Sequence, residues 1–586
     1  MNDSVADSTT DIGKNQDETA TAQGNEKIKD ANDLLRAGGN DAVANAFDDI
    51  LDHAAENLDG LKEETTRAQE QATKEKEADH AQKKAAFEKK LAARLLEFSF
   101  NDLFNARRIY IAYGNEIRYD KLTGIWGFFK DGVWSFDTDK NSALLTYTAE
   151  IARILSENRP KPLAPPTNED GSLRQLDAKE EAQLKQYNFR CEYIQKKVEG
   201  FHYRNTQFNA IEMLKGVEEI IIRQSDLDQY PMLLNVKNGV IDLETGKLLP
   251  AAPELLLTKQ ANVIFDPTAR APVFEKFMQE ILPDEETRGA VLRYLGYCLT
   301  GRVNEEKALF VWGRGANGKG TLFKAMLKLF GSYGTSFNIK ALLKPKIPKD
   351  GESATPEIAK LEGVRIAIAD EIPVGANFDV AKFKNLTGGD IVTARALYQP
   401  PKNFEPNFKF VLSGNTLPRL EGADDDGFNR RAVIVKFLQQ FTGAKADQQL
   451  KARLEQPAEL SGILNILIAE CLDWQKPKAQ GGGLLESRAM VAEKKEFLAD
   501  NDWFSAFIEE RCELGAEFDV GRKRLLNALK GYDPRARPVR DKLLEELILK
   551  LDGVTKEHGA RHSKYDNVDY FAGIRLMEDN DSTPQP

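Results

Sequence analysis

The sequence predicts a multidomain α/β protein whose central domain holds a parallel β-sheet with helices on both faces. The 586 residues are enough for roughly three or four domains of ordinary size, each with its own core. In the middle of the chain, helical patterns separate four apolar runs of strand length: Ala308–Trp312, Val364–Ala369, Phe408–Leu412 and Ala432–Val435. Near-continuous apolar strands mixed with helices are typical of a parallel sheet covered on both sides.

Shifts in composition along the chain predict five successive segments. They are an acidic disordered leader with a charged helix (1–98), an α+β domain (99–265), the parallel-sheet domain (266–480), a smaller C-terminal domain (488–578) and a disordered tail (579–586). The C-terminal domain is expected to contain helices at 496–513, 520–530 and 540–551 and a closing strand at 570–576.

The net charge of −11 is concentrated near the N-terminus. Residues 1–80 hold 20 acidic and 8 basic residues, a net charge of −12, so the rest of the chain carries a net charge of +1. Residues 1–40 have few large apolar side chains and cannot bury enough surface to fold. Residues 41–98 favour a helix with charges on most faces, and we prefer a solvated helix to an oligomerisation arm. The remainder of the chain can therefore present basic surfaces to nucleic acid.

The α+β domain begins with a predicted β-meander. Strands are expected at 117–119, 125–129 and 133–136, with Asp131-Gly132 as a tight turn, and helices at 144–158 and 178–223. Trp126, Phe128 and Trp134 can stack on bases, but aromatic residues in a small meander more often form its own core.

The four cysteines contain no Cys-x-x-Cys pair, and the five histidines form no close cluster, so the sequence does not favour a structural zinc site. Unpaired thiols fit a reducing compartment. We find no signal peptide and no apolar run long enough to span a bilayer, and we expect a cytoplasmic protein that does not associate with membranes.

A glycine-rich loop between the first apolar strand and a helical pattern predicts a phosphate-binding site. Its candidate nucleotide-binding residues are Gly313, Gly315, Ala316, Asn317, Gly318, Lys319, Gly320 and Thr321. Backbone N–H groups and the helix N-terminus can hold phosphate oxygens, and Lys319 can reach the β and γ phosphates. The hydroxyl that usually follows this lysine to hold Mg²⁺ arrives one residue late, at Thr321. A glycine loop that binds nothing is the alternative, and the strand and helix beside it argue against that reading.

Polar residues follow the later strands of the predicted sheet. Asp370 and Glu371 end the second strand, and we assign Mg²⁺ binding to Asp370 and activation of the attacking water to Glu371. Asn415 follows the third strand, where an amide can contact the γ-phosphate or the attacking water. Arg430 and Arg431 precede the fourth strand, and one of them can act as an arginine finger toward a neighbouring subunit.

These motifs occur in a characteristic order, together with the segment Lys384-Asn-Leu-Thr-Gly-Gly-Asp390 and the run Ala394-Arg-Ala-Leu-Tyr398. The order resembles that of superfamily 3 helicases, in the phage and plasmid primase-helicase branch that includes the poxvirus replication helicase. Leu233–Gly246 and Ala354–Leu361 also look like that branch, and the resemblance covers about residues 100–575.

The resemblance implies a P-loop, AAA+-like ATPase domain at 266–480, a family-specific N-terminal domain at 99–265 and a winged-helix-like domain at 488–578. It implies a hexameric ring that hydrolyses ATP with Mg²⁺ at subunit interfaces and encircles nucleic acid. By the same similarity, residues 384–404 form a hairpin that lines the pore. Lys384, Arg395 and Lys402 are then the candidates for contacts with nucleic-acid phosphates.

The resulting prediction is an ATP-dependent replicative DNA helicase of phage or plasmid origin, acting in the cytoplasm of a bacterial host. Its expected partners are single-stranded DNA in the pore, duplex DNA at the C-terminal domain, further copies of itself and a separate primase or polymerase. Two alternatives stay open. One is an origin-binding or replisome scaffold whose ATP site stabilises the ring, and the other is a P-loop nucleotide kinase.

Overall fold

A computed structural model describes residues 71, 78–137, 142–344, 354–369, 371–373, 376–398, 400–420, 426–443, 447–501, 503–533, 536–537, 539–559, 564 and 568–577. The chain divides into two compact units. Unit 1 comprises residues 1–112 and 144–212, and unit 2 comprises residues 113–143 and 213–586. The expectations for residues 1–70 and 579–586 lie outside the described residues.

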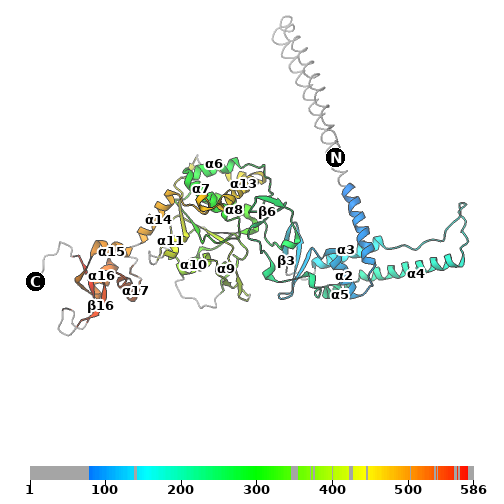
Figure 1. Ribbon diagram of the computed structural model, residues 1–586, viewed down its shortest axis with the longest axis horizontal. Coiled ribbons are helices and arrows are strands. Elements are labelled where there is room, and N and C mark those ends of the chain that lie inside the picture. Colours follow the sequence, from blue (N-terminus) through cyan, green and yellow to red (C-terminus); the bar gives the residue numbers. More distant parts are fainter. Residues whose placement is uncertain are drawn as a thin grey trace, which may run out of the picture. The chain divides into compact units, whose positions relative to one another are not determined.

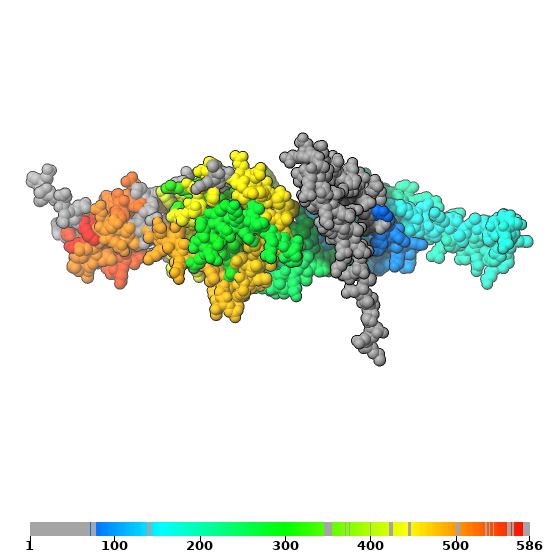
Figure 2. All heavy atoms as spheres, turned by 90° about the horizontal axis from the view of Figure 1, so that it is seen from above, coloured from blue at the N-terminus to red at the C-terminus, as the bar shows by residue number. Residues whose placement is uncertain are grey.

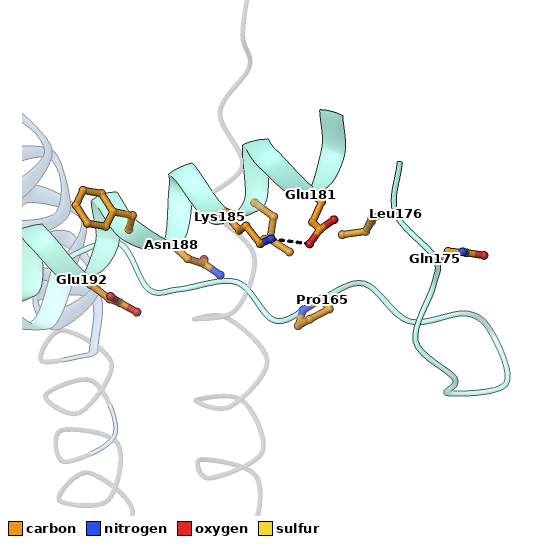
Figure 3. Close-up of a pocket in the computed structure, with 9 residues that line it drawn as sticks. Pro165, Gln175, Leu176, Glu181, Lys185, Asn188 and Glu192 are labelled. Atoms are coloured by element: carbon orange, nitrogen blue, oxygen red, sulfur yellow. Dashed lines mark ion pairs between the residues drawn. The ribbon is translucent and has the colours of Figure 1, made fainter. Parts of the chain in front are cut away.

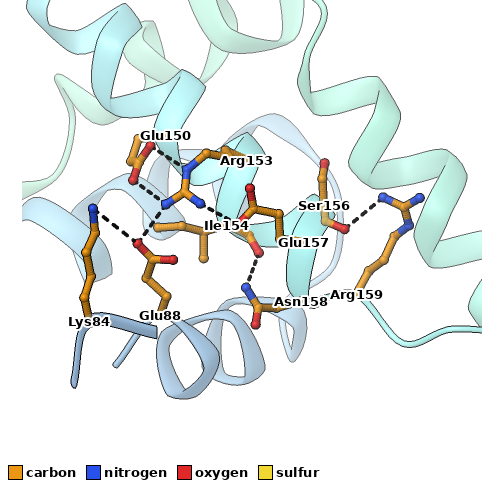
Figure 4. A network of polar contacts seen from close by, with 9 residues as sticks. All are labelled: Lys84, Glu88, Glu150, Arg153, Ile154, Ser156, Glu157, Asn158 and Arg159. Atoms are coloured by element: carbon orange, nitrogen blue, oxygen red, sulfur yellow. Dashed lines mark hydrogen bonds and ion pairs between the residues drawn. The ribbon is translucent and has the colours of Figure 1, made fainter. Parts of the chain in front are cut away.

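Unit 1 is helical in its described part. Its elements are residues 78–96, α2 (Asp102–Tyr113), α3 (Ser142–Asn158), α4 (Ala178–Phe201) and α5 (Arg204–Leu214). Arg153 on α3 pairs with Glu88 on the first of these helices at 2.7 Å, and also with Glu150 and Glu157 (Figure 4). This network fastens α3 to the helix at 78–96.

A buried arginine lies at the end of the helix at 78–96. Arg108 is fully buried and donates hydrogen bonds to the main-chain carbonyls of Leu95, Phe98 and Ser99. The last carbonyls of a helix have no partner within the helix, and the guanidinium satisfies that of Leu95 while it also binds the carbonyls of Phe98 and Ser99 just beyond the helix. Burial lowers the pKa of Arg108 to about 10.

The central sheet of unit 2 has five strands in the order β14-β8-β13-β10-β9, and all its pairings are parallel. The strands are β8 (Ala308–Trp312), β9 (Gly334–Ser336), β10 (Ile366–Ala369), β13 (Lys409–Gly414) and β14 (Ala432–Lys436). The four apolar runs therefore form parallel strands, as predicted. Strand β9 pairs with β10 at the edge of the sheet and was not predicted.

Alternate residues of these strands enter two different cores. Leu309 and Val311 pack with α6 (Pro272–Ile281), α7 (Glu285–Tyr297), α8 (Lys319–Phe330) and α13 (Pro457–Trp474). Ala308 and Phe310 pack with α9 (Pro356–Ala359), α10 (Val380–Thr387) and α11 (Asp426–Arg431). Figure 1 shows these two sets of helices on opposite sides of the sheet, and in Figure 2 the green and yellow residues of this part form one continuous packed body. The predicted parallel sheet with helices on both faces is confirmed.

The predicted meander is present as β1 (Ile117–Asp120), β2 (Ile125–Lys130) and β3 (Val133–Asp137). Asp131 and Gly132 form its turn with φ angles of 52° and 78°. Trp126 and Trp134 are each only 1% exposed, so they belong to the core as expected. The helix predicted to reach residue 223 was wrong at its end, because α5 stops at Leu214 and Ile221–Ile222 forms β4, which pairs with β1.

Two further antiparallel arrangements complete unit 2. Strands β5 (Leu233–Val236), β6 (Gly239–Asp242) and β7 (Lys247–Leu249) form one sheet, and β11 (Val392–Ala394) pairs with β12 (Lys402–Phe404) as a hairpin. The C-terminal part contains α14 (Arg488–Asn501), α15 (Trp503–Arg511), β15 (Cys512–Gly521), α16 (Arg522–Tyr532), α17 (Asp541–Ile548), β16 (Thr555–His558) and β17 (Asp569–Leu576). The closing strand was predicted, whereas β15 and β16 were not.

Candidate functional site

Three candidate segments meet at the carboxyl edge of the parallel sheet. Trp312 at the end of β8 pairs with Gly414 near the end of β13, and Ala369 at the end of β10 pairs with Leu412. Beyond β10, the N–H of Ile372 donates to the carbonyl of Ser413 at 3.1 Å. The glycine loop, Glu371 and Asn415 therefore follow neighbouring strands at one edge, which is where parallel α/β sheets bind ligands.

The glycine loop follows β8, and α8 begins at Lys319. Gly313 and Gly318 have φ angles of 149° and 86°, in the region that favours glycine. A Cβ on Gly313 would lie 2.3 Å from the carbonyl oxygen of Phe437, and one on Gly318 would lie 2.5 Å from Ile281. The loop is thus held tightly against α6 and the segment after β14. Gly315 and Gly320 have open space at the position of a Cβ.

Lys319 and Asn317 are buried inside this loop, at 7% and 3% exposure. The Nζ atom of Lys319 donates to the carbonyl of Gly313 at 2.8 Å. Burial lowers the pKa of Lys319 from its ordinary value. The Nδ2 atom of Asn317 is buried and has no hydrogen-bond partner. Buried polar groups are normally paired, so this donor and the inward-turned lysine fit a loop built around an anionic group.

Glu371 and Asn415 lie exposed at the same sheet edge. Glu371 has a left-handed φ of 62°, a backbone conformation that is rare for residues other than glycine and that concentrates at functional sites. Asp370, the predicted Mg²⁺ ligand, lies outside the described residues. Thr321 is half-buried in the first turn of α8, so its hydroxyl belongs to the helix start that follows the loop.

The two arginines lie at the opposite edge of the sheet. Arg430 and Arg431 end α11 directly before β14, whose first residue, Ala432, pairs with the first residue of β8. The glycine loop begins after the last residue of β8, so about 13 Å of strand separates the two edges. Within one subunit the arginines therefore do not lie beside the glycine loop.

The two arginines differ in exposure. The side chain of Arg431 is 7% exposed, pairs with Glu306 at 2.5 Å and donates to the carbonyl of Gly427. The side chain of Arg430 is 68% exposed and lies 3.7 Å from the same carboxylate. Glu306 was not predicted from the sequence, because nothing in its local pattern indicates a partner that lies more than 120 residues away.

The candidate nucleic-acid residues occupy the β11–β12 hairpin and the helix before it. Lys402 on β12 pairs with Glu362 at 2.6 Å and is about 39% exposed. Arg395 follows β11 and is exposed, and Lys384 is half-buried on α10. The hairpin thus brings Arg395 and Lys402 together, while Lys384 belongs to a different element.

Two cavities lined by described residues lie elsewhere. A cleft of about 1270 Å³ in unit 2 lies among the meander, the β5–β6 region and the base of the hairpin, and Lys237, Lys259 and Lys402 are among its lining residues. A cavity of about 710 Å³ lies in unit 1 between α4 and the segment before it, where Lys185 and Glu181 form an ion pair of 2.7 Å (Figure 3). Neither cavity includes the glycine loop.

Two kinds of feature are absent from the described residues. No described helix is long and apolar enough to cross a membrane. Among the same residues, no group of three or more His, Cys, Asp or Glu side chains is placed to hold a metal ion.

These features define an α/β protein with a glycine loop, a carboxylate and an amide at the carboxyl edge of a parallel sheet. Two family models match the chain. Residues 106–283 match the family described as "D5 N terminal like", and residues 311–431 match a "Family of unknown function (DUF5906)".

Viral proteins are among its relatives. The chain is 33% identical over 222 residues to "Putative helicase L207/L206" of Acanthamoeba polyphaga mimivirus, covering 37% of this chain and 23% of the relative. It is 30% identical over 237 residues to "Putative helicase 184R" of Invertebrate iridescent virus 6, covering 38% and 24%. It is 24% identical over 237 residues to "Putative primase C962R" of African swine fever virus, with the same shares. The chain thus spans about a quarter of the length of these relatives.

A solved structure, the apo C-terminal region of NrS-1, aligns over 82% of this chain and 100% of its own length, with 10% identity and a TM-score of 0.39. The two family matches and the viral relatives confirm the resemblance of this chain to the phage and viral primase-helicase type of superfamily 3.

Proposed function

We propose that this protein is an ATP-driven DNA translocase that forms a ring and unwinds DNA during phage or viral replication. The observation that carries the proposal is the buried Lys319 in its glycine loop, at the same sheet edge as Glu371 and Asn415. The helicase and primase names of the relatives support a role in replication. The cytoplasm of the infected or plasmid-bearing cell is the expected location.

ATP is the substrate that fits the loop. The P-loop, AAA+-like assignment rests on the strand, loop and helix order, the buried lysine and the unpaired amide of Asn317. Lys319 then contacts the β and γ phosphates, Glu371 orients and deprotonates the attacking water, and Asn415 holds the γ-phosphate or that water by its amide. Thr321 and Asp370 would hold Mg²⁺, which would neutralise phosphate charge when bound.

The position of the arginines supports hydrolysis at a subunit interface. A finger must reach the phosphates, and neither arginine lies beside the glycine loop of its own chain. Arg430 is exposed and available to a neighbour, whereas Arg431 is buried against Glu306. We therefore assign the finger to Arg430 and a positioning role to Arg431. A closed ring, hexameric by the family resemblance, supplies the neighbour.

The C-terminal part supports a winged-helix assignment. Its order of α15, β15, α16, α17, β16 and β17, with an antiparallel sheet in the order β15-β17-β16, is that of a winged helix. Lys523 and Arg524 at the start of α16 and Lys542 at the start of α17 are exposed. They are the candidates for contacts with duplex DNA.

Strand displacement on forked DNA tests the proposal. Substrates with only a 3′ or only a 5′ single-stranded tail should separate with ATP and Mg²⁺, and the preferred tail gives the polarity, which we expect to be 3′ to 5′. The Lys319→Ala protein serves as the negative control. A protein that forms ATP-dependent rings on DNA without turnover or displacement would instead be a replication scaffold, and phosphoryl transfer to a free nucleotide would indicate a kinase.

A separate primase is expected to supply primers.

A further inference from the structure

The tip of the β11–β12 hairpin carries the most exposed large apolar side chain of the described residues. Tyr398 is 102% exposed and its neighbour Leu397 is 61% exposed. Tyr398 also has a left-handed φ of 61°. Large aromatic side chains are usually at least partly covered, and residues other than glycine seldom adopt this backbone conformation. A strained and fully exposed aromatic side chain is a reason to look for a ligand.

The base of the hairpin is firmly anchored. Val392 and Ala394 are 5% and 3% exposed and belong to the core beneath the sheet, and each pairs with a residue of β12. Thr355 holds the end of β11 twice, because its N–H donates to the carbonyl of Arg395 and its hydroxyl accepts from the N–H of Arg395. The tip therefore projects from a fixed support.

Proline residues follow the tip. Pro400 and Pro401 lead into β12, and their fixed φ angles restrict the backbone directly before Lys402. The C-terminal side of the hairpin tip thus has restricted backbone freedom. Such pre-organisation reduces the entropy lost when a ligand binds.

Cationic side chains flank the tip on both strands. Arg395 is exposed just before it, and Lys402, about 39% exposed, begins β12 after it. An aromatic face between two cations matches one nucleotide step, because the ring can stack on a base while the cations contact the flanking phosphates. Stacking of this kind tolerates any base, since every base has a flat π-face.

We propose that Tyr398 is a stacking platform for an unpaired nucleobase and that Leu397 packs against the neighbouring base. The proposal rests on the proposed translocation along nucleic acid and adds the contact by which the hairpin holds the strand. It predicts a contribution to affinity that is independent of sequence and of salt, in contrast to the phosphate contacts of Arg395 and Lys402.

Binding of single-stranded oligonucleotides that carry 2-aminopurine tests the proposal with the full-length chain. Stacking on Tyr398 should change the fluorescence of the analogue. The Tyr398→Ala protein should bind at least about fivefold more weakly and lose that change, with an unaltered salt dependence. Tyr398→Phe should keep both, because it retains the ring. Tyr203→Ala is the matched control, since Tyr203 is an exposed tyrosine of unit 1 at 70% exposure.

Three results would overturn the proposal. One is unchanged affinity and fluorescence in Tyr398→Ala. A second is an equal loss in Tyr398→Phe, which would assign the effect to the hydroxyl. The third is an equal loss in Tyr203→Ala. ATP hydrolysis measured without nucleic acid should be the same in all variants, which separates a stacking defect from failure of the ATPase. A wild-type protein that binds no nucleic acid would overturn the proposed function together with this inference.

Discussion

The Nζ atom of Lys319 donates a hydrogen bond to the carbonyl oxygen of Gly313 at 2.8 Å. The side chain of the lysine thus connects the end of the glycine loop to its first residue. Its charge is buried, and burial lowers its pKa, yet no carboxylate is paired with it in the described residues. A buried cation of this kind is stabilised when an anion binds beside it. A loop of this kind suits an anionic ligand, in keeping with the proposed binding of ATP phosphates.

Replacement of Lys319 by alanine should lower ATP hydrolysis by at least about 100-fold, because a charge-stabilising donor is lost from a pre-organised site. Release of inorganic phosphate is the measurement. Lys324→Ala is the matched control, since Lys324 lies on the same helix and is exposed. DNA-stimulated turnover that persists in Lys319→Ala would refute the assignment of the loop.

Replacement of Thr321 by alanine should raise the Mg²⁺ concentration needed for hydrolysis by about tenfold or more, because a metal ligand is lost. Position 320 offers a rescue. A Cβ on Gly320 meets nothing within 4 Å, so a serine fits there and places a hydroxyl directly after the lysine. We expect the double variant Gly320→Ser, Thr321→Ala to recover most of the Mg²⁺ response. A Thr321→Ala protein with a normal Mg²⁺ titration would show that another group orders the metal.

The strands of the central sheet were predictable because they are buried on both faces. Ala308–Trp312 contains no charged residue, and such a run has few alternatives to a strand that is buried on both faces. Strand β9, Gly334–Ser336, carries no such pattern, since its place depends on pairing with β10 at the sheet edge. Similarly, Ile221–Ile222 reads as the end of a helix until β1 is available to pair with it. Short strands of this kind are defined by their partners, not by their own residues.

The candidate site shows the same difference between features that the local sequence indicates and features that depend on distant partners. The sequence located the glycine loop, Glu371 and Asn415, because each directly follows a recognisable strand, and parallel strands end at one edge. It could not distinguish Arg430 from Arg431. That distinction depends on Glu306, which folding brings beneath α11 through the packing of Phe428 against Phe310, with ring centroids 5.5 Å apart.

Mixing experiments should separate the two arginines. Arg430→Ala and Glu371→Gln proteins should each be inactive alone, and their mixture should regain activity. A mixed ring contains interfaces at which an intact Glu371 meets an intact Arg430 from the neighbouring subunit. Removal of an arginine finger typically costs about 10³- to 10⁵-fold in rate, so the gain on mixing should be easy to measure as phosphate release.

Arg431→Ala should behave differently. It leaves Glu306 without its buried partner and should lower the melting temperature, whereas Arg430→Ala should not.

The mixing experiment also has an outcome that would exclude action between subunits. That outcome is no gain in activity when Arg430→Ala and Glu371→Gln are mixed, with intact rings by light scattering.

Lys402 should contribute one phosphate contact, and its partner Glu362 should weaken that contact. Lys402→Gln is expected to reduce the slope of log affinity against log salt by about one for single-stranded DNA. Glu362→Gln should raise the affinity for single-stranded DNA at low salt, because it frees Lys402 from its ion pair. Fluorescence anisotropy across a salt series measures both. Equal slopes in wild type and Lys402→Gln would remove this residue from the nucleic-acid path.

A buried lysine at the other end of the sheet predicts a pH dependence of stability. Lys409 begins β13 and is 2% exposed, and its Nζ atom donates to the carbonyls of Thr300 and Asn407. Burial lowers its pKa to about 7, against an ordinary value of 10.5. Between these two values the unfolded chain holds a proton that the folded chain has released. The free energy of unfolding should therefore rise with pH in that window, by about 1.4 kcal/mol per pH unit from this group alone.

The Lys409→Met protein isolates this contribution. Cys298 and Cys471 also act on Lys409, but burial raises the pKa of each thiol to about 12, above the window. The difference in unfolding free energy between wild type and Lys409→Met should thus change in favour of wild type from pH 7 to pH 10, and should be flat below pH 6, where both states are protonated. Chemical denaturation at several pH values measures it. A constant difference across pH 7–10 would mean that Lys409 keeps its ordinary pKa in the folded protein.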